Sequence, residues 1–280
     1  LSIWKTLPSF LIVVVFAGLF LGNKIPTISQ TINSSTPNLA FGYTIAIGQY
    51  VVGMLVTLLI LVPLFDLDKT AGALIAVGFQ GGHGTVAGLQ STFESVNFAQ
   101  GMDLGLGIAT IGLMSAIILG TLMSNRSQDD QHKASMKISE NDEPMEIRDR
   151  PIGLQFAILG SVIAIAWLLL TGLKSAEAAL FSESDVVILK YMPLFPIAML
   201  IGLAVQVILN KLKVGHWTSH YQINLISNLS LDILIVAALG SLDLAVLAKN
   251  WQPLLILGLT GVGYSVGIYF LLGGWFFRKD

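Results

Sequence analysis

The sequence predicts an all-α integral membrane protein, and composition is the first observation behind that prediction. Hydrophobic residues make up 54% of the 280 residues, charged residues only 11%, and the mean hydropathy is +0.76. In soluble domains, charged residues alone usually amount to about a quarter. The lipid bilayer is therefore the expected surroundings of the chain. A net charge of −2 and the lack of a basic cluster with interleaved aromatic residues exclude nucleic acid as an expected partner.

Long apolar runs without a charged residue are the second observation. A helix needs about 20 such residues to cross a bilayer, and only the first run is at the short limit. The runs are residues 6–23, 25–65, 104–125, 151–173, 191–210 and 250–277. So many runs exclude a single cleavable signal peptide as their explanation. We expect helices over 8–23, 39–64, 104–124, 152–173, 186–210, 229–248 and 252–277.

A charged segment divides the chain into two membrane halves. Residues 126–150 hold mixed charges, a proline and almost no apolar periodicity, which predicts a solvated linker. The halves are residues 1–125 and 151–280. Lys and Arg are more numerous on the linker's side of the predicted helices, so we expect a cytoplasmic linker. This count does not decide whether the Gly-rich segment before 104 crosses the membrane or returns.

The Gly-rich segment, residues 71–94, holds six glycines together with Gln, His, Thr and Ser side chains. A lipid-facing helix would lose propensity at each glycine and bury several polar groups. Non-helical backbone at membrane depth is tolerated where protein or a water-filled cavity surrounds it. We expect a re-entrant hairpin that leaves backbone groups of residues 81–85 free. The alternative is a Gly-rich helix packed tightly against its neighbours.

The two halves show a weak internal similarity. Leu11-Ile12-Val13 aligns with Leu234-Ile235-Val236, and the helices that follow, 39–64 and 252–277, then correspond. In the predicted orientation, helix 8–23 runs inward and helix 229–248 runs outward. Inverted repeats of this kind are typical of secondary transporters, whose sites lie near the midplane where interrupted segments meet.

The stretches "GALIAVGFQGGHGTVAGL", residues 72–89, and "SNLSLDILIVAALGSLDLAVL", residues 227–247, resemble the bacterial sodium/glutamate symporters. The resemblance covers most of the chain. It implies two inverted repeats of five membrane segments, each with a Gly-rich re-entrant loop between its fourth and fifth segments. It also implies symport of L-glutamate, or a related acidic amino acid, with Na⁺ across the bacterial plasma membrane. A homodimer is a candidate assembly, and no cofactor is expected.

The sequence departs from the family's pattern in two ways. Gln80 stands where a small residue is usual, which puts the substrate in doubt and makes Gln80 a candidate for selecting it. The second Gly-rich loop is absent from these residues. We therefore expect the chain to be a fragment, incomplete in its first repeat before Leu1 and in its second after Asp280.

The glycine turn supplies the first group of candidate site residues. Consecutive N–H groups over Gly81, Gly82 and Gly84 would suit a carboxylate. Free carbonyl groups and the hydroxyl of Thr85 would suit Na⁺, a hard cation. His83 is a candidate proton carrier or donor, or simply a histidine hydrogen-bonded at a helix break.

The second group lies in the second half. Asp232 and Asp243 would share one face of an unbroken helix, with Asn228 one turn before Asp232. A carboxylate at membrane depth indicates function, here a Na⁺ ligand or a counter-charge for the substrate amine, with Ser230 beside it. The alternatives are a first-turn position for Asp232, a loop position for Asp243 and a helix start for Asp103.

Three classes of function are candidates for this chain. A cation-coupled symporter fits the hairpin, the repeat and the resemblance. The alternative is an ion channel, or another organic-anion transporter, with the Gly-rich loop as its selectivity filter. An intramembrane enzyme is not expected, because the sequence has no HExxH and no cysteine, and its GxSxG, residues 263–267, falls inside the predicted helix 252–277 rather than at a strand-to-helix turn.

Overall fold

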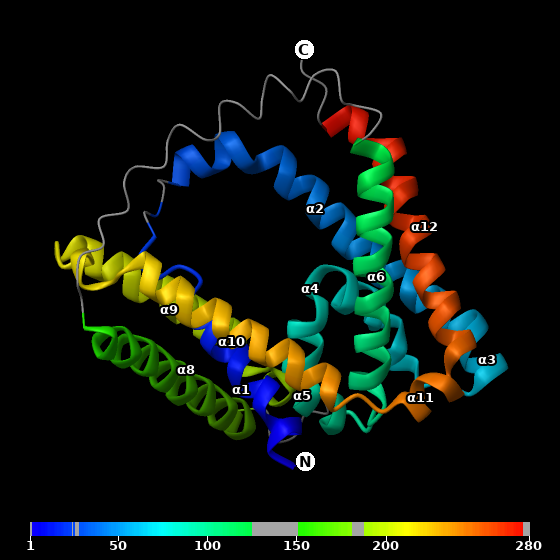
Figure 1. Cartoon of the computed structure of the whole chain (residues 1–280), viewed down its shortest axis with the longest axis horizontal. Helices are drawn as coiled ribbons and strands as arrows, with labels where there is room; N and C mark the ends of the chain where they lie inside the picture. Colours follow the sequence, from blue (N-terminus) through cyan, green and yellow to red (C-terminus); the bar gives the residue numbers. More distant parts are fainter. Residues whose placement is uncertain (1, 24, 26–27, 125–150, 181–187, 277–280) are drawn as a thin grey trace.

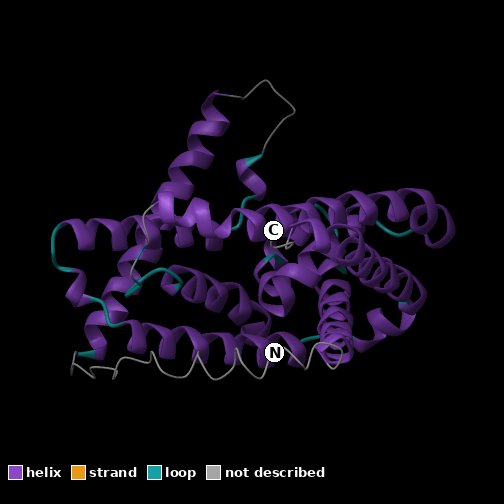
Figure 2. Cartoon of the chain, turned by 90° about the horizontal axis from the view of Figure 1, so that it is seen from above, coloured by secondary structure: helices purple, strands orange, loops and turns teal. Residues whose placement is uncertain are grey.

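The computed structural model describes residues 2–23, 25, 28–124, 151–180 and 188–276, and this part of the chain is built from helices and the loops between them (Figure 2). Within these residues, six helices are long and apolar enough to cross a membrane. They are Thr36–Phe65, Gly101–Leu122, Ile152–Leu180, Leu194–Lys211, His220–Gly240 and Trp251–Gly273. A shorter apolar helix, Thr6–Gly18, precedes them. The predicted all-α membrane fold is confirmed.

The first half begins with two apolar helices and ends with a third. Helix α2 (Ile28–Val56) continues through a π-helical turn, Thr57–Leu61, into α3 (Val62–Phe65). A 3₁₀ turn, Lys69–Ala73, then leads on to α4 (Leu74–Gly88). Asp68 caps that 3₁₀ turn by accepting a hydrogen bond from the N–H of Thr70 at 2.8 Å. The helices are α1 (Ser2–Gly18), α2 (Ile28–Val56), α3 (Val62–Phe65), α4 (Leu74–Gly88), α5 (Gln90–Ser95) and α6 (Gly101–Ser124).

The second half contains four long helices and one short one. Two polar side chains begin helices here: Ser219 accepts from the N–H of Gln222, and Asp243 accepts from the N–H of Ala245 at 2.9 Å. The helices are α8 (Ile152–Leu180), α9 (Leu194–Lys211), α10 (His220–Gly240), α11 (Leu244–Lys249) and α12 (Trp251–Phe276). Short 3₁₀ turns precede α9 and α10, at Leu189–Tyr191 and Gly215–Trp217.

The long helices form two groups with α4 between them. Helices α1, α8, α9 and α10 pack together on one side, and α2, α6 and α12 on the other (Figure 1). Helix α4 contacts members of both groups. Helices α1 and α10 run antiparallel, because Gly18 lies against Ser227 while Gly22, further along α1's direction, lies against His220. Gly22 has a φ of 75° and almost touches the His220 backbone, so a side chain does not fit there.

The structure corrects several predicted helix bounds. The predicted helix 229–248 is wrong at both ends, since α10 begins at His220 and ends at Gly240. Ser219 caps the N-terminus of α10, so the helix begins nine residues before the predicted start, and Gly240-Ser241 ends it. Helix α9 begins at Leu194 rather than at 186, because Pro193 stands at its N-cap. Helix α1 ends at Gly18 rather than at 23. The predicted linker, residues 126–150, lies outside the described residues.

Candidate functional site

The Gly-rich segment reverses its direction beside α6. A side chain added at Gly105 of α6 would meet both Val86 and Leu74, at 2.7 and 3.5 Å from its Cβ. One added at Gly112, about two turns further along α6, would meet Phe79 at 2.8 Å. The chain therefore rises along α6 through the first arm of α4 and comes back down through the second. Figure 1 shows α4 bending over beside α6.

Gly82 is the point of reversal. Its φ of 62° and ψ of −166° fall in a region that essentially only glycine occupies. No described atom lies within 4 Å of the position where a Cβ would stand, so the backbone there faces open space. The break is narrower than the turn predicted over residues 81–85, because Gly82 alone departs from helical geometry.

His83 opens the second arm and is held by α6. Its Nε2 lies 3.0 Å from the hydroxyl oxygen of Thr110. That hydroxyl donates its own hydrogen to the carbonyl oxygen of Leu106 at 2.9 Å. The hydroxyl is thus an acceptor toward His83, which assigns the imidazole proton to Nε2. The interpretation of His83 as a hydrogen-bonded histidine at a helix break fits this contact, and a role toward a ligand remains a prediction.

Thr85 and Gly84, in the second arm, have different neighbours. A Cβ added at Gly81 would stand 2.6 Å from Thr85 Oγ1, so the Thr85 hydroxyl lies over the end of the first arm, next to the break. Gly84 is buried, and a Cβ there would contact Ile12 of α1 and Leu231 of α10. The Thr85 side chain therefore lies against the end of the first arm at Gly81, and Gly84 brings the second arm against α1 and α10.

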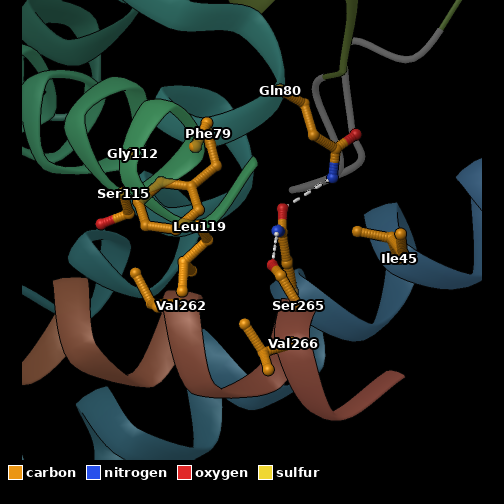
Figure 3. A pocket seen from close by; sticks show the side chains of 11 residues that line it. Ile45, Phe79, Gln80, Gly112, Ser115, Leu119, Val262, Ser265 and Val266 are labelled. Carbon is orange, nitrogen blue, oxygen red and sulfur yellow. Dashed lines mark hydrogen bonds between the residues drawn. The ribbon is translucent and has the colours of Figure 1, made fainter. Parts of the chain in front are cut away.

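Gln80, a predicted site residue, belongs to a chain of polar side chains whose other members, Gln49 and Ser265, were not predicted. Its Nε2 donates to Gln49 Oε1 of α2 at 2.8 Å, and Gln49 Nε2 donates to the Ser265 hydroxyl of α12 at 3.0 Å. The Ser265 hydroxyl donates in turn to the carbonyl oxygen of Gly261 at 2.8 Å. Figure 3 shows Gln80 and Ser265 at the two ends of this hydrogen-bonded chain.

These side chains border a cavity of about 270 Å³ between α2, α4, α6 and α12, next to the break at Gly82. It is lined by Ile45, Gln49, Phe79, Gln80, Gly112, Ser115, Ala116, Leu119, Val262, Ser265 and Val266. The lining carries no charged side chain. A signal for it exists in the sequence: Gln49 and Ser265 are isolated polar residues in long apolar runs, where a polar group needs a partner.

The polar residues of α10 lie in the middle of that helix. Asp232 and Asn228 are exposed and one turn apart, whereas Ser230 is buried and donates to the carbonyl oxygen of Ile226 at 2.7 Å. Because α10 begins at His220, the alternative of a first-turn position for Asp232 is wrong. Leu231 brings this part of α10 to Gly84, although within the described residues no hydrogen bond or ion pair joins Asp232 to the hairpin.

Asp243 and Asp103 have a different role from Asp232. Asp243 follows the end of α10 and caps α11, so the prediction that it shares a helix face with Asp232 is wrong and the loop alternative is confirmed. Asp103 lies in the first turn of α6, and its carboxylate accepts from the backbone N–H of Asp243 at 2.9 Å. Its interpretation as a helix-start residue is confirmed. The two acids fasten the α10–α11 connection to α6.

Comparison with known proteins gives one match. The family model described as sodium/glutamate symporter matches residues 1–271. No curated protein and no solved structure matched the chain.

Proposed function

Because the chain belongs to the sodium/glutamate symporter family, we propose that it carries L-glutamate, or a closely related acidic amino acid, together with Na⁺ across the plasma membrane by alternating access. The family is one of transporters rather than enzymes. The six apolar helices make this a multi-pass membrane protein.

The break at Gly82 is the observation that indicates where the proposed site lies. Secondary transporters hold anionic groups at the N-terminal ends of interrupted helices, and cations at unwound carbonyl groups. The second arm begins at His83, so the N–H groups of His83 and Gly84 are the proposed donors to a substrate carboxylate. The last carbonyl groups of the first arm, at Gln80 and Gly81, and the adjacent Thr85 hydroxyl are the proposed ligands of Na⁺.

Helix α10 is the proposed second wall of this site. Asp232 is a carboxylate halfway along a helix that is long enough to span the bilayer, and such groups usually serve an ion or substrate pathway. We assign to it a Na⁺ ligand or the counter-charge of the substrate amine, with Asn228 beside it and Ser230 on the side that packs against the protein. Gln80, at the cavity next to the break, is the proposed selector of the substrate side chain.

The packing of the helices supports the proposed inverted repeat. The sequence alignment pairs α1 with α10 and α2 with α12. Each of these helices packs against its own counterpart, with Gly18 against Ser227 in the first pair and Gly48 against Tyr264 in the second. Elements near a two-fold axis contact their own symmetry mates, so this pairing is expected of two repeats related by such an axis. Rocking of the two helix groups about α4 is the proposed basis of alternating access.

Uptake of radiolabelled L-glutamate by proteoliposomes tests the proposal. We expect saturable uptake that an inward Na⁺ gradient drives and that collapses when K⁺ replaces Na⁺. Uptake that rises linearly with glutamate concentration and ignores the Na⁺ gradient would instead favour a channel. Saturable, Na⁺-driven uptake of a different organic anion would keep the mechanism and replace the substrate.

A further inference from the structure

A second polar cavity lies at the far end of the α1, α9 and α10 group, away from the break at Gly82. It has a volume of about 550 Å³ and is lined by Gly22, Asn23, Ile25, Gln206, Asn210, Lys213 and Gly215. The hairpin contacts α1 near its middle, at Ile12, whereas this cavity lies beyond the end of α1, where Gly22 meets the start of α10. It is therefore separate from the site proposed for glutamate and Na⁺.

Hydrogen bonds within the protein leave this cavity rich in donors. The buried Gln206 accepts at Oε1 from the N–H of Gly22 at 2.8 Å and from the hydroxyl of Thr218 at 3.3 Å. Its Nε2 donates to Asn210 Oδ1 at 3.0 Å. Both amide oxygens are thus engaged by protein donors, while each amide NH₂ group keeps at least one hydrogen without an acceptor among the described residues. The remaining hydrogen-bonding capacity of Gln206 and Asn210 suits a ligand that accepts hydrogen bonds.

Lys213 supplies the charge of the cavity. It has a φ of 60°, and the N–H groups of Lys213 and Val214 bond back to the carbonyl groups of Asn210 and Leu209 at 3.1 and 3.0 Å, which closes α9. This left-handed position favours glycine, so a lysine costs backbone energy here. Among the described residues, no ion pair holds its ammonium group. The described segments around the cavity contain no carboxylate that could neutralise Lys213, and they also carry Lys211. These segments are residues 18–23, 151–160 and 206–225.

The cavity also stands where a membrane surface would lie. Helix α9 is long enough to span the bilayer and ends at Lys211, directly before the cavity. Three large side chains beside it are exposed: Leu212 at 66%, Trp217 at 49% and Tyr221 at 48%. Aromatic residues gather at the interface between hydrocarbon and water, where phospholipid headgroups lie.

We propose that this cavity binds the phosphate group of an anionic phospholipid. The Lys213 ammonium pairs with the phosphate, and the free amide hydrogens of Asn210 and Gln206 donate to its oxygens. Leu212 and Trp217 contact the upper part of the acyl chains. A free anion would use the same donors, but it would gain nothing from these exposed apolar side chains.

The binding is testable on the purified protein in detergent, with phosphatidylglycerol as the probe. Thermal unfolding followed by tryptophan fluorescence gives the lipid concentration at half-maximal stabilisation. We expect phosphatidylglycerol to raise the melting temperature in a saturable way, and zwitterionic phosphatidylcholine to have a much smaller effect. Lys213→Gln should raise the half-saturating concentration about five-fold.

Two further variants separate binding from folding and from general surface charge. Lys213→Gly should weaken the binding of phosphatidylglycerol to the same extent as Lys213→Gln. It should not lower the melting temperature measured without lipid, since glycine suits the backbone there. Lys211→Gln, which removes the same charge two residues away and outside the lining, should change the half-saturating concentration less than two-fold. Equal responses to both lipids, or equal losses in Lys211→Gln and Lys213→Gln, would overturn the proposal. So would the same stabilisation by inorganic phosphate alone, which would make the cavity a site for free anions.

Discussion

The side-chain amide of Gln80 donates a hydrogen bond to the side-chain oxygen of Gln49 at 2.8 Å, across 31 residues of sequence. Gln80 lies two residues before the break at Gly82, and Gln49 lies in the C-terminal third of α2. This contact therefore ties the tip of the hairpin to α2, and through Gln49 to Ser265 of α12. The position of the proposed site depends on it.

The link between Gln49 and Gln80 should appear as an energetic coupling. Gln49→Leu should lower the free energy of unfolding by about 1 kcal/mol, because a buried amide and two hydrogen bonds are lost. Gln80→Leu should cost less, since its side chain is exposed. The loss of unfolding free energy in the double variant should be smaller than the sum of the two single-variant losses, by about 0.5 kcal/mol or more. Chemical unfolding of the four proteins in detergent measures this, and strictly additive losses would remove the link from the account.

Gly82→Ala should abolish measurable glutamate binding while the protein still inserts into membranes. Any Cβ is disfavoured at a φ of 62° and a ψ of −166°, by about 1–3 kcal/mol, and relaxing that strain redirects the backbone N–H groups that follow. Gly160→Ala is the matched control, because Gly160 is an exposed helical glycine of α8 with no described atom near its Cβ position. Membrane fractionation checks insertion, and a filter-binding assay checks glutamate. Full binding by Gly82→Ala would mean that the break does not form the site.

Thr110→Val should weaken glutamate binding about ten-fold, which corresponds to the loss of one hydrogen bond that orients His83. Thr110→Ser keeps the hydroxyl and should bind within about two-fold of the original protein. Equilibrium dissociation constants at one fixed Na⁺ concentration provide the comparison. If the valine and serine variants bind equally well, the orientation of His83 does not matter for the substrate.

Asp232→Asn should raise the Na⁺ concentration needed for half-maximal glutamate binding. Removing one carboxylate at membrane depth takes away a full charge from the proposed ion site. Asp243→Asn removes the same charge from the α11 cap, where asparagine serves equally well, and should leave the Na⁺ dependence unchanged. Na⁺ titrations of the two variants side by side make the comparison. An unchanged Na⁺ requirement in Asp232→Asn would exclude this carboxylate as an ion ligand.

The membrane class and the location of the break followed from the sequence, because both depend on local properties. Uncharged runs long enough to span a bilayer predict helices without knowledge of their neighbours. A concentration of glycines around Gly82 predicts an interruption, since helix propensity is lost at each of them. The break at Gly82 lies within the segment where an interruption is predicted, whereas the re-entrant course of that segment through a membrane stays a prediction.

Helix bounds and side-chain partners were harder to predict. Apolar residues continue past Gly240, so hydropathy alone extended the helix to 248, whereas the caps at Ser219 and Asp243 define the real bounds. Because the predicted helix began at 229, Asp232 was expected near its start, whereas Asp232 lies in the middle of α10. The contact of Gln49 with Ser265 spans 216 residues, and only the packing of α2 against α12 brings the two together. No local pattern could pair them.

Equilibrium binding of radiolabelled L-glutamate to the purified protein, in Na⁺ and in K⁺ buffers of equal ionic strength, tests the central claim most directly. We expect saturable binding in Na⁺ that excess unlabelled L-glutamate displaces, and loss of that binding in K⁺. Equal binding in the two buffers would contradict the coupling to Na⁺. The absence of saturable binding in both would contradict the assignment of glutamate as the substrate.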